Sequence, residues 1–286
     1  MKGISAVVAT LNRKDELERL FCSILDNDIK ELELVIVDQN TNGLIDGLIA
    51  SYRDRLDINH IKMTEANQSK ARNLGASHAK YPVICFPDDD CWYDSRSLQH
   101  VQTYFEANED TDLLVINWRQ NPIVHNDSFP LTKKEVFTFR SVGYVTYVLF
   151  FNKGVFAKLG GFMETIGIGK FIGGGEDSEL TFRAISNNLR VYYHAGIHVH
   201  HKYIPVTNRD LPVIRARQRA MGLMYAKYDI PRYVVLKGLT APLVKAAFCM
   251  NIKKAREYYN MFLGRKEGYI YGLKNRANES GALIYS

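Results

Sequence analysis

Apolar runs alternate with segments of helical periodicity along the N-terminal third of the chain. Short apolar runs predict buried strands at residues 4–10, 32–37, 58–63 and 83–86. Apolar positions three and four residues apart predict helices at residues 14–25, 44–52 and 70–79. Strands that alternate with helices in this way are typical of βαβ units and of a mainly parallel sheet. We expect the strand at 58–63 to lie nearer an edge of that sheet.

The rest of the chain divides into a mixed segment and a helical one. Strand-like runs recur at residues 113–117, 146–151 and 191–194, and a helix is predicted at 179–187. Five glycines between residues 167 and 175 favour a mobile loop over a substrate. From Asp210 onward the pattern is helical, with breaks expected at Gly238 and Pro242. We therefore predict one α/β domain over residues 1–205, with halves at 1–118 and 119–205, and a basic helical extension over 206–286.

Polar residues gather directly after three of the predicted strands. They are Thr10, Asn12 and Arg13 after the first, Asp38, Gln39 and Asn40 after the second, and Asp88, Asp89 and Asp90 after the fourth. Open parallel sheets bind their ligands at the carboxyl ends of the strands. The positions of these residues therefore predict a nucleotide-binding site.

The three consecutive aspartates at 88–90 indicate a cation. Adjacent carboxylates repel one another, and such a cluster is costly unless a positive charge compensates it. Carboxylate oxygens suit Mg²⁺ or Mn²⁺, which would also bind the phosphates of a nucleotide diphosphate. His200 or His201 would complete the metal shell. The alternative is a solvated acidic turn or a helix cap.

A second acidic pair, Glu176 and Asp177, follows the glycine run and precedes a predicted helix. A carboxylate held there would be able to deprotonate an acceptor hydroxyl as it attacks a sugar. The alternative is that both side chains only complement the dipole of the helix.

Charge is distributed unevenly in a chain of otherwise ordinary globular composition, which is 46% hydrophobic and 24% charged over 286 residues. Residues 201–286 carry 16 Lys or Arg and 5 Asp or Glu, a balance of +11, whereas residues 1–200 carry 21 and 26, a balance of −5. The basic tail suits peripheral binding to an anionic membrane or to a phosphorylated lipid carrier. A plain packing face, or the face of a homodimer, is the alternative.

The expected cellular location follows from two features that the sequence does not show, a membrane-spanning run and a secretory signal. No apolar run approaches the about 20 residues that span a bilayer, and the N-terminal residues do not resemble a secretory signal. The four cysteines form no C-x-x-C pair, which disfavours a thiolate zinc site. We expect a cytoplasmic protein, at the inner face of the cell membrane if the tail binds lipid.

Several segments together resemble family 2 glycosyltransferases of the GT-A fold. In chain order they are VVATLNR (7–13), LVIVDQNTN (34–42), NQSKARNLGASHA (67–79), FPDDDC (86–91), LGGFMETIG (159–167) and GGGEDSEL (173–180). FLGRKEGYIYGL (262–273) resembles the C-terminal tail of many such bacterial enzymes. The resemblance implies an α/β, GT-A (Rossmann-like) fold, with a mainly parallel sheet flanked by helices and a C-terminal helical extension.

The resemblance also implies a reaction. The enzyme would transfer a sugar from a nucleotide diphosphate sugar, with UDP or dTDP favoured, to a hydroxyl of a glycan or lipid-diphosphate-linked glycan, with inversion at the anomeric carbon. Capsule, O-antigen or another surface polysaccharide would be the product, and Mn²⁺ or Mg²⁺ the cofactor.

The residue roles that the resemblance implies fall into three groups. The nucleotide-sugar would be bound by Thr10, Asn12, Arg13, Asp38, Gln39, Asn67, Arg72, Asp88 and Asp89. Asp88, Asp90 and either His200 or His201 would bind the metal. Asp177 would act as general base, supported by Glu176, and Asp38 would accept a hydrogen bond from N3 of uracil or thymine.

Two departures from the family pattern and two other functions stay open. Gln39 stands where a second Asp is usual, and Asn67-Gln68-Ser69 replaces Asn-x-Gly. A metal-dependent nucleotidyltransferase acting on sugar phosphates would place glycines in the first strand-end turn, which has none. A non-catalytic nucleic-acid binder fits the pI of about 9.0 but not the acidic residues 1–200, so no nucleic-acid partner is expected.

Overall fold

The computed structural model describes residues 3–27, 29–120, 126–137, 144–202 and 210–279. The chain forms two compact units. Unit 1 comprises residues 1–132, 141–162 and 183–204, and unit 2 comprises residues 133–140, 163–182 and 205–286. The domain boundaries at 118 and 205 that the sequence suggested stay a prediction.

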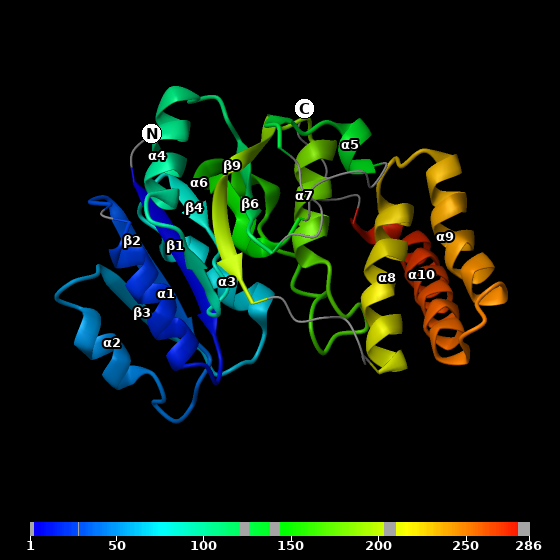
Figure 1. Cartoon of the computed structure of the whole chain (residues 1–286), viewed down its shortest axis with the longest axis horizontal. Helices are drawn as coiled ribbons and strands as arrows, with labels where there is room; N and C mark the ends of the chain where they lie inside the picture. The colour runs from blue at the N-terminus through cyan, green and yellow to red at the C-terminus, as the bar shows by residue number, and fades with distance from the viewer. Residues whose placement is uncertain (1–2, 28, 121–125, 138–143, 203–209, 280–286) are drawn as a thin grey trace. The chain divides into compact units, whose positions relative to one another are not determined.

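Unit 1 is built on one mixed, mostly parallel sheet (Figure 1). Its strands are β1 (Ile4–Thr10), β2 (Leu32–Asp38), β3 (Ile58–Lys62), β4 (Val83–Cys85), β5 (Cys91–Tyr93), β6 (Leu113–Trp118), β7 (Phe129–Pro130), β8 (Leu149–Asn152) and β9 (Val191–His201). The order is β3-β2-β1-β4-β8-β6-β9-β5, and β7 pairs with β9. The expected position of the 58–63 strand at an edge is confirmed, since β3 ends the sheet.

The N-terminal part of the sheet is parallel because each strand returns through a helix. β1 pairs in parallel with both β2 and β4, and β2 pairs in parallel with β3. The helices of unit 1 are α1 (Asp15–Leu25), α2 (Asp46–Tyr52), α3 (Gln68–His78), α4 (Ser97–Ala107) and α6 (Lys153–Leu159), with a 3₁₀ turn η1 (Thr146–Val148). The predicted strand at 146–151 is therefore wrong in its first half, which forms η1.

Unit 2 contains α5 (Lys133–Phe137), α8 (Leu211–Lys227), α9 (Arg232–Ala247) and α10 (Ile252–Glu279), while α7 (Glu176–Ser186) contributes residues to both units. α10 packs against both α8 and α9. Gly264, Gly268 and Gly272, four residues apart on α10, allow this close approach to α8. A Cβ at Gly268 would overlap the carbonyl oxygen of Arg219. The predicted C-terminal helical extension is confirmed.

The expected helix breaks at Gly238 and Pro242 are wrong, because α9 runs through both. A proline inside a helix leaves the carbonyl four residues before it without its amide donor. For Pro242 that carbonyl belongs to Gly238, and Arg265 of α10 donates to it at 2.5 Å. A half-buried side chain from another helix therefore replaces the lost hydrogen bond. No helix among the described residues combines the length and the apolar character that crossing a bilayer demands.

Candidate active site

The loops after β1, β2 and β4 meet at one edge of the unit 1 sheet. Thr10 at the end of β1 lies opposite Asp38 at the end of β2, and both side chains are buried. The backbone N–H of Asn12 donates to Oδ1 of Asn40 at 2.7 Å and so joins the two loops. Asn12 has φ 57, a left-handed conformation that Asn tolerates better than most residues.

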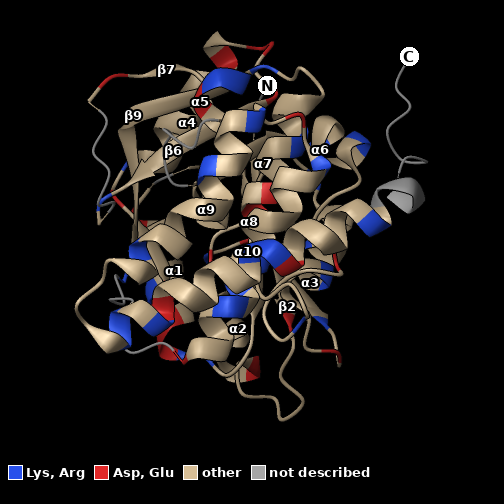
Figure 2. Ribbon diagram, turned by 90° about the vertical axis from the view of Figure 1, so that its right-hand side faces the viewer, with Lys and Arg blue, Asp and Glu red and all other residues tan. Residues whose placement is uncertain are grey.

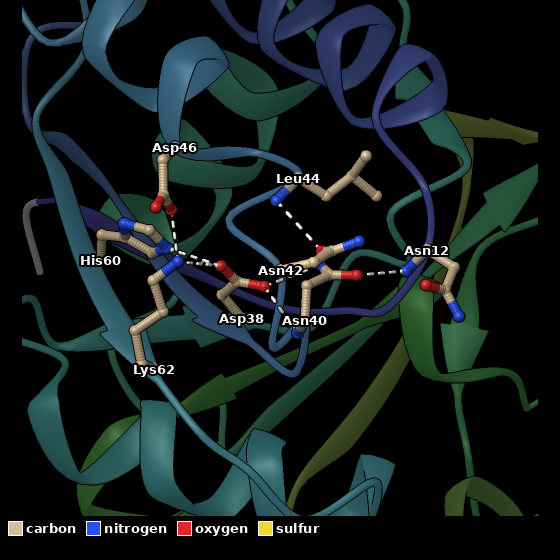
Figure 3. A network of polar contacts seen from close by, with 8 residues as sticks. All are labelled: Asn12, Asp38, Asn40, Asn42, Leu44, Asp46, His60 and Lys62. Carbon is tan, nitrogen blue, oxygen red and sulfur yellow. Dashed lines mark hydrogen bonds and ion pairs between the residues drawn. The ribbon is translucent and has the colours of Figure 1, made fainter.

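Asp38 is the centre of a saturated hydrogen-bond network (Figure 3). Its Oδ1 accepts from the backbone N–H and the Nδ2 of Asn40, at 2.9 and 2.7 Å. Its Oδ2 accepts from Nζ of Lys62 at 2.9 Å and lies 3.0 Å from Nε2 of His60. Burial raises the pKa of Asp38, but the bonds from Asn40, Lys62 and His60 outweigh burial and lower it. The carboxylate is therefore held ionised.

Gln39 connects the loop after β2 to the start of α3. Its Oε1 accepts a hydrogen bond from the backbone N–H of Asn67 at 2.8 Å. Asn67 in turn caps α3 by accepting from the N–H of Lys70 at 3.1 Å. Gln39, which stands where the family pattern usually has a second Asp, therefore helps to fix the position of the α3 N-terminus.

The acidic turn after β4 is held by two arginines that come from α3 and from the β1 loop. Arg72, itself buried, donates from Nη2 to Oδ1 of Asp88 at 2.7 Å. Arg13 pairs with Asp90 and approaches Asp89 to 3.3 Å. The two guanidinium groups offset part of the repulsion among the three carboxylates, and guanidinium groups are also preferred partners of phosphate.

The two buried aspartates titrate in opposite directions. Burial raises the pKa of Asp89 to about 6, against the opposing effect of Arg13. Burial also acts on Asp90, but the contacts with His201 and Arg13 outweigh it and bring the pKa of Asp90 to about 2. Asp90 is therefore fully ionised at neutral pH.

His201 joins the acidic cluster and His200 does not. Nε2 of His201 lies 3.1 Å from Oδ1 of Asp90 and 4.0 Å from Oδ2 of Asp88, and its ring stacks on Tyr147 at 4.6 Å. Successive residues of a strand point to opposite faces. His200 accordingly turns to Asp94, 2.6 Å away, and stacks on Trp92. Of the two histidines named as candidates, the structure brings only His201 to the cluster.

Asp88, Asp90 and His201 fit a divalent cation. Each offers one ligand atom, and these atoms lie within 4.8 Å of one another. Two carboxylate oxygens and one imidazole nitrogen suit Mn²⁺ and are compatible with Mg²⁺. Among the described residues, Asp38, Asp46 and His60 form a second such group. There the ammonium of Lys62 already pairs with both aspartates, so an internal cation fills that place.

The acidic pair of unit 2 lies inside the first turn of α7. The helix begins at Glu176, three residues before the predicted start. Oδ1 of Asp177 accepts from the N–H of Ser178 at 2.6 Å, and Glu176 is buried. The helix dipole favours negative charge at this position. Glu179, one turn further, is buried and accepts from Tyr228 at 2.7 Å and Lys227 at 3.1 Å, which holds α7 to α8.

The glycine-rich loop before α7 packs against α8 at its C-terminal end, and its mobility stays a prediction. The N–H of Gly173 donates to the carbonyl of Ala216 at 3.0 Å, and a Cβ at Gly175 would come within 2.6 Å of the Cβ of Ala220. Ile172 is buried in an apolar cluster with Ala220. These two glycines therefore serve close approach to a helix.

His60, Lys62 and Tyr147 belong to the site but were absent from the residues that the sequence suggested. Residues 60 and 62 alternate in β3 and must share one face, and Lys62 lies in register with Asp38. The hydrophobic pattern of residues 58–63 does not show which strand they pair with, so it could not predict that His60 and Lys62 lie beside Asp38. Tyr147 was not predicted as a site residue because its segment was predicted to be a strand.

Solved structures of glycosyltransferases share this fold. TarS residues 1–349 of S. aureus, in complex with UDP-GlcNAc, match with a TM-score of 0.66 and 13% identity over 100% of this chain and 93% of that chain. The mannosyltransferase PcManGT of Pyrobaculum calidifontis, in complex with GDP-Man and Mn²⁺, matches with a TM-score of 0.63 and 15% identity over 96% and 86%. The fold is therefore the mixed, mostly parallel GT-A fold, as predicted.

The family is defined by the sequence match. The family described as Glycosyl transferase family 2 matches residues 5–158, and the chain belongs to this family. The poly(ribitol-phosphate) β-N-acetylglucosaminyltransferase TarP of Staphylococcus aureus (strain N315) is 29% identical over 119 residues, which are 40% of this chain. The match spans 36% of the length of TarP. The predicted family is thus confirmed.

Proposed function

We propose that the protein transfers a sugar from a UDP-sugar to a hydroxyl of a surface glycan, with inversion and with help from a divalent cation. The observation that carries the proposal is that Asp38 and the cluster of Asp88, Asp90 and His201 lie at or just after the ends of strands that finish at the same edge of one sheet. A base-reading carboxylate and a diphosphate-binding cluster at one sheet edge fit a nucleotide diphosphate. Family membership favours glycosyl transfer over nucleotidyl transfer and over nucleic-acid binding.

The surroundings of Asp38 favour a uracil or thymine base. An ionised carboxylate offers about four lone-pair sites, and Asn40, His60 and Lys62 fill them. The base must therefore displace a donor, and Lys62, with a side chain 48% exposed, is the accessible one. Uracil presents an N–H between two carbonyls, so it can donate to Asp38 while accepting from Lys62 and Asn40. Guanine presents two adjacent N–H donors, which would face the ammonium of Lys62.

The diphosphate is assigned to the arginines and to the metal cluster. Arg13 and Arg72 border the three aspartates and would bind phosphate oxygens as the donor enters. Asp88, Asp90 and His201 would hold Mn²⁺ or Mg²⁺, which supplies positive charge that stabilises the departing diphosphate. His201 would contribute its Nε2 lone pair, with its ring held flat against Tyr147.

The acceptor hydroxyl is assigned to Asp177. We propose that this carboxylate removes the hydroxyl proton as the oxygen attacks the anomeric carbon, with Glu176 supporting it in the first turn of α7. A base on the side opposite the leaving diphosphate permits a single in-line displacement, which inverts the anomeric carbon. The name of TarP mentions poly(ribitol-phosphate), which supports a surface glycopolymer, such as a teichoic acid, capsule or O-antigen chain, as the acceptor.

Donor turnover in the presence of Mn²⁺ tests this proposal. The protein is incubated with UDP-, dTDP- and GDP-sugars, and release of the nucleotide diphosphate is measured together with UDP affinity. Asp177→Asn is expected to reduce turnover by about 10²-fold or more, while its UDP affinity stays that of the parent. Asp177→Asn with full turnover would contradict the role of Asp177, and no turnover of any of the three donors by the parent would contradict the whole proposal.

A further inference from the structure

The exposed side of α9 is apolar, which inverts the usual arrangement of a helix in a water-soluble protein. Tyr233, Leu236, Leu243 and Val244 are all exposed. Their spacing along the sequence places them on one face at 3.6 residues per turn. A helix on the surface of a soluble protein normally buries its apolar stripe and exposes the polar one.

The turn between α9 and α10 extends the same apolar surface. Phe248, Met250 and Ile252 are 84%, 102% and 73% exposed. Three large apolar side chains within five residues expose far more apolar area than isolated surface residues do, and apolar exposure concentrated in this way marks a binding surface. We call the seven residues of α9 and this turn the α9 surface. They are Tyr233, Leu236, Leu243, Val244, Phe248, Met250 and Ile252.

The charged residues within the segment that carries the α9 surface are all positive. Residues 230–256 contain no Asp or Glu, and the ribbon of α9 in Figure 2 is tan and blue without red. The cations are Arg232, Lys237, Lys245, Lys253, Lys254 and Arg256. Apolar side chains flanked by Lys and Arg without acidic neighbours are the composition that binds an anionic membrane surface.

The position of Lys237 distinguishes a membrane from a protein partner. It is exposed on the same face as Tyr233 and Leu236. Lysine is depleted in the cores of protein interfaces because its ammonium loses water there. At a membrane the long stem lies along the lipid while the ammonium reaches the headgroups. We propose that the α9 surface docks the protein on an anionic phospholipid bilayer. This goes beyond the transfer reaction and does not depend on it.

Binding of the full chain to vesicles tests the proposal. Flotation with phosphatidylcholine vesicles is compared with flotation with vesicles that also contain phosphatidylglycerol. We expect binding to the anionic vesicles only. The variant with Phe248→Ser, Met250→Ser and Ile252→Ser should lose this binding. Lys237→Gln with Lys254→Gln should weaken it by about fivefold for each charge removed.

Control variants distinguish a specific role of the α9 surface from the effect of removing any exposed apolar or basic residue. Val213→Ser removes an exposed apolar residue of α8, and Arg53→Gln removes an exposed cation near α2, and both should bind like the parent. Met250→Trp should show a blue-shifted fluorescence on adding anionic vesicles, whereas Val213→Trp should not. Circular dichroism confirms that each variant is folded.

Two results would overturn the proposal. One is the same vesicle binding, or none, for the parent and the triple serine variant. The other is a concentration-dependent dimer in sedimentation that the triple variant abolishes, because the α9 surface would then be covered by a second copy of the chain.

Discussion

Lys62 illustrates how one side chain can decide which nucleotide a site accepts. Its ammonium bridges the buried Asp38 and the exposed Asp46. Asp38 already accepts from Asn40 and lies beside His60. A ligand can therefore donate to Asp38 only at the position on the carboxylate that Lys62 occupies. Against the effect of burial, the hydrogen bonds from Asn40 and then from Lys62 keep the pKa of Asp38 low, so the carboxylate accepts and does not donate.

Removing the ammonium tests this specificity at the residue scale. Lys62→Met keeps most of the stem and loses the donor. We expect UDP affinity to fall by about tenfold, since a hydrogen bond from a charged group contributes about 1.5–3 kcal/mol. GDP affinity, which is expected to be weak in the parent, should be unchanged or slightly higher. Titration calorimetry with both nucleotides measures the ratio, and an unchanged UDP-to-GDP ratio would contradict the role of Lys62.

At this scale the sequence identified the residues that follow strands and missed those that arrive through pairing. Asp38 and Asp90 are visible because a polar residue after an apolar run marks a strand end. His60 and Lys62 are not, because only the neighbouring position of β3 brings them to Asp38. His200 and His201 were inseparable for a related reason. The alternation of side chains along a strand shows that the two histidines face opposite sides of the sheet, but not which of them faces the acidic cluster.

At the scale of elements, the packing of α10 on α8 depends on small residues and on one half-buried carboxylate. Gly264, Gly268 and Gly272 face α8, and Glu267 accepts hydrogen bonds from Arg215 and Arg219 of α8. The helical period of this tail was visible in the sequence. The continuation of α9 through Pro242 was not, because the compensating donor, Arg265, lies on another helix.

Gly268→Ala tests the close approach of these helices. An alanine in a helix is normally more stable than glycine by about 1 kcal/mol. Here the added Cβ would overlap the carbonyl oxygen of Arg219, so we expect a loss of about 1–3 kcal/mol. Gly47→Ala in α2, where nothing lies within 4 Å of the added Cβ, should instead be stabilising. Chemical denaturation measures the change in the free energy of unfolding of each variant. An increase for both variants would contradict the close packing of Gly268 against α8.

Glu267→Gln tests the ion pairs through their pH dependence. Arg215, together with Arg219 and against the effect of burial, lowers the pKa of Glu267 below its ordinary value of 4.5. A depressed carboxyl pKa adds stability above the unfolded pKa, and that stability disappears as pH falls through the folded pKa. We expect the variant to lose about 1 kcal/mol at pH 7, with partial exposure limiting the effect.

The difference between Glu267→Gln and the parent should shrink as the pH falls below 4.5. Asp110→Asn, which removes an exposed pair with Arg190, should change the free energy of unfolding very little at any pH. A difference for Glu267→Gln that is constant between pH 3 and pH 7 would show that Glu267 contributes by packing alone.

For the molecule as a whole, the fold class and the chemistry at the strand ends were accessible from the sequence, because βαβ periodicity determines which loops share an edge. The packing of the glycine loop was not accessible, because it depends on Ala216 and Ala220, which lie further along the chain, beyond α7. The exposure of the turn at Phe248–Ile252 was equally inaccessible, since apolar residues in a sequence predict burial.

We propose that Asp88, Asp90 and His201 bind a divalent cation that contributes to nucleotide diphosphate binding. Titration calorimetry of UDP, with and without Mn²⁺, tests it most directly in the parent, in Asp90→Asn and in Asp94→Asn, a neighbouring carboxylate that pairs with His200. We predict that Mn²⁺ raises UDP affinity by about tenfold or more in the parent and in Asp94→Asn, and that Asp90→Asn loses the effect of Mn²⁺. UDP binding that ignores Mn²⁺ in the parent, or a full Mn²⁺ effect in Asp90→Asn, would contradict the claim.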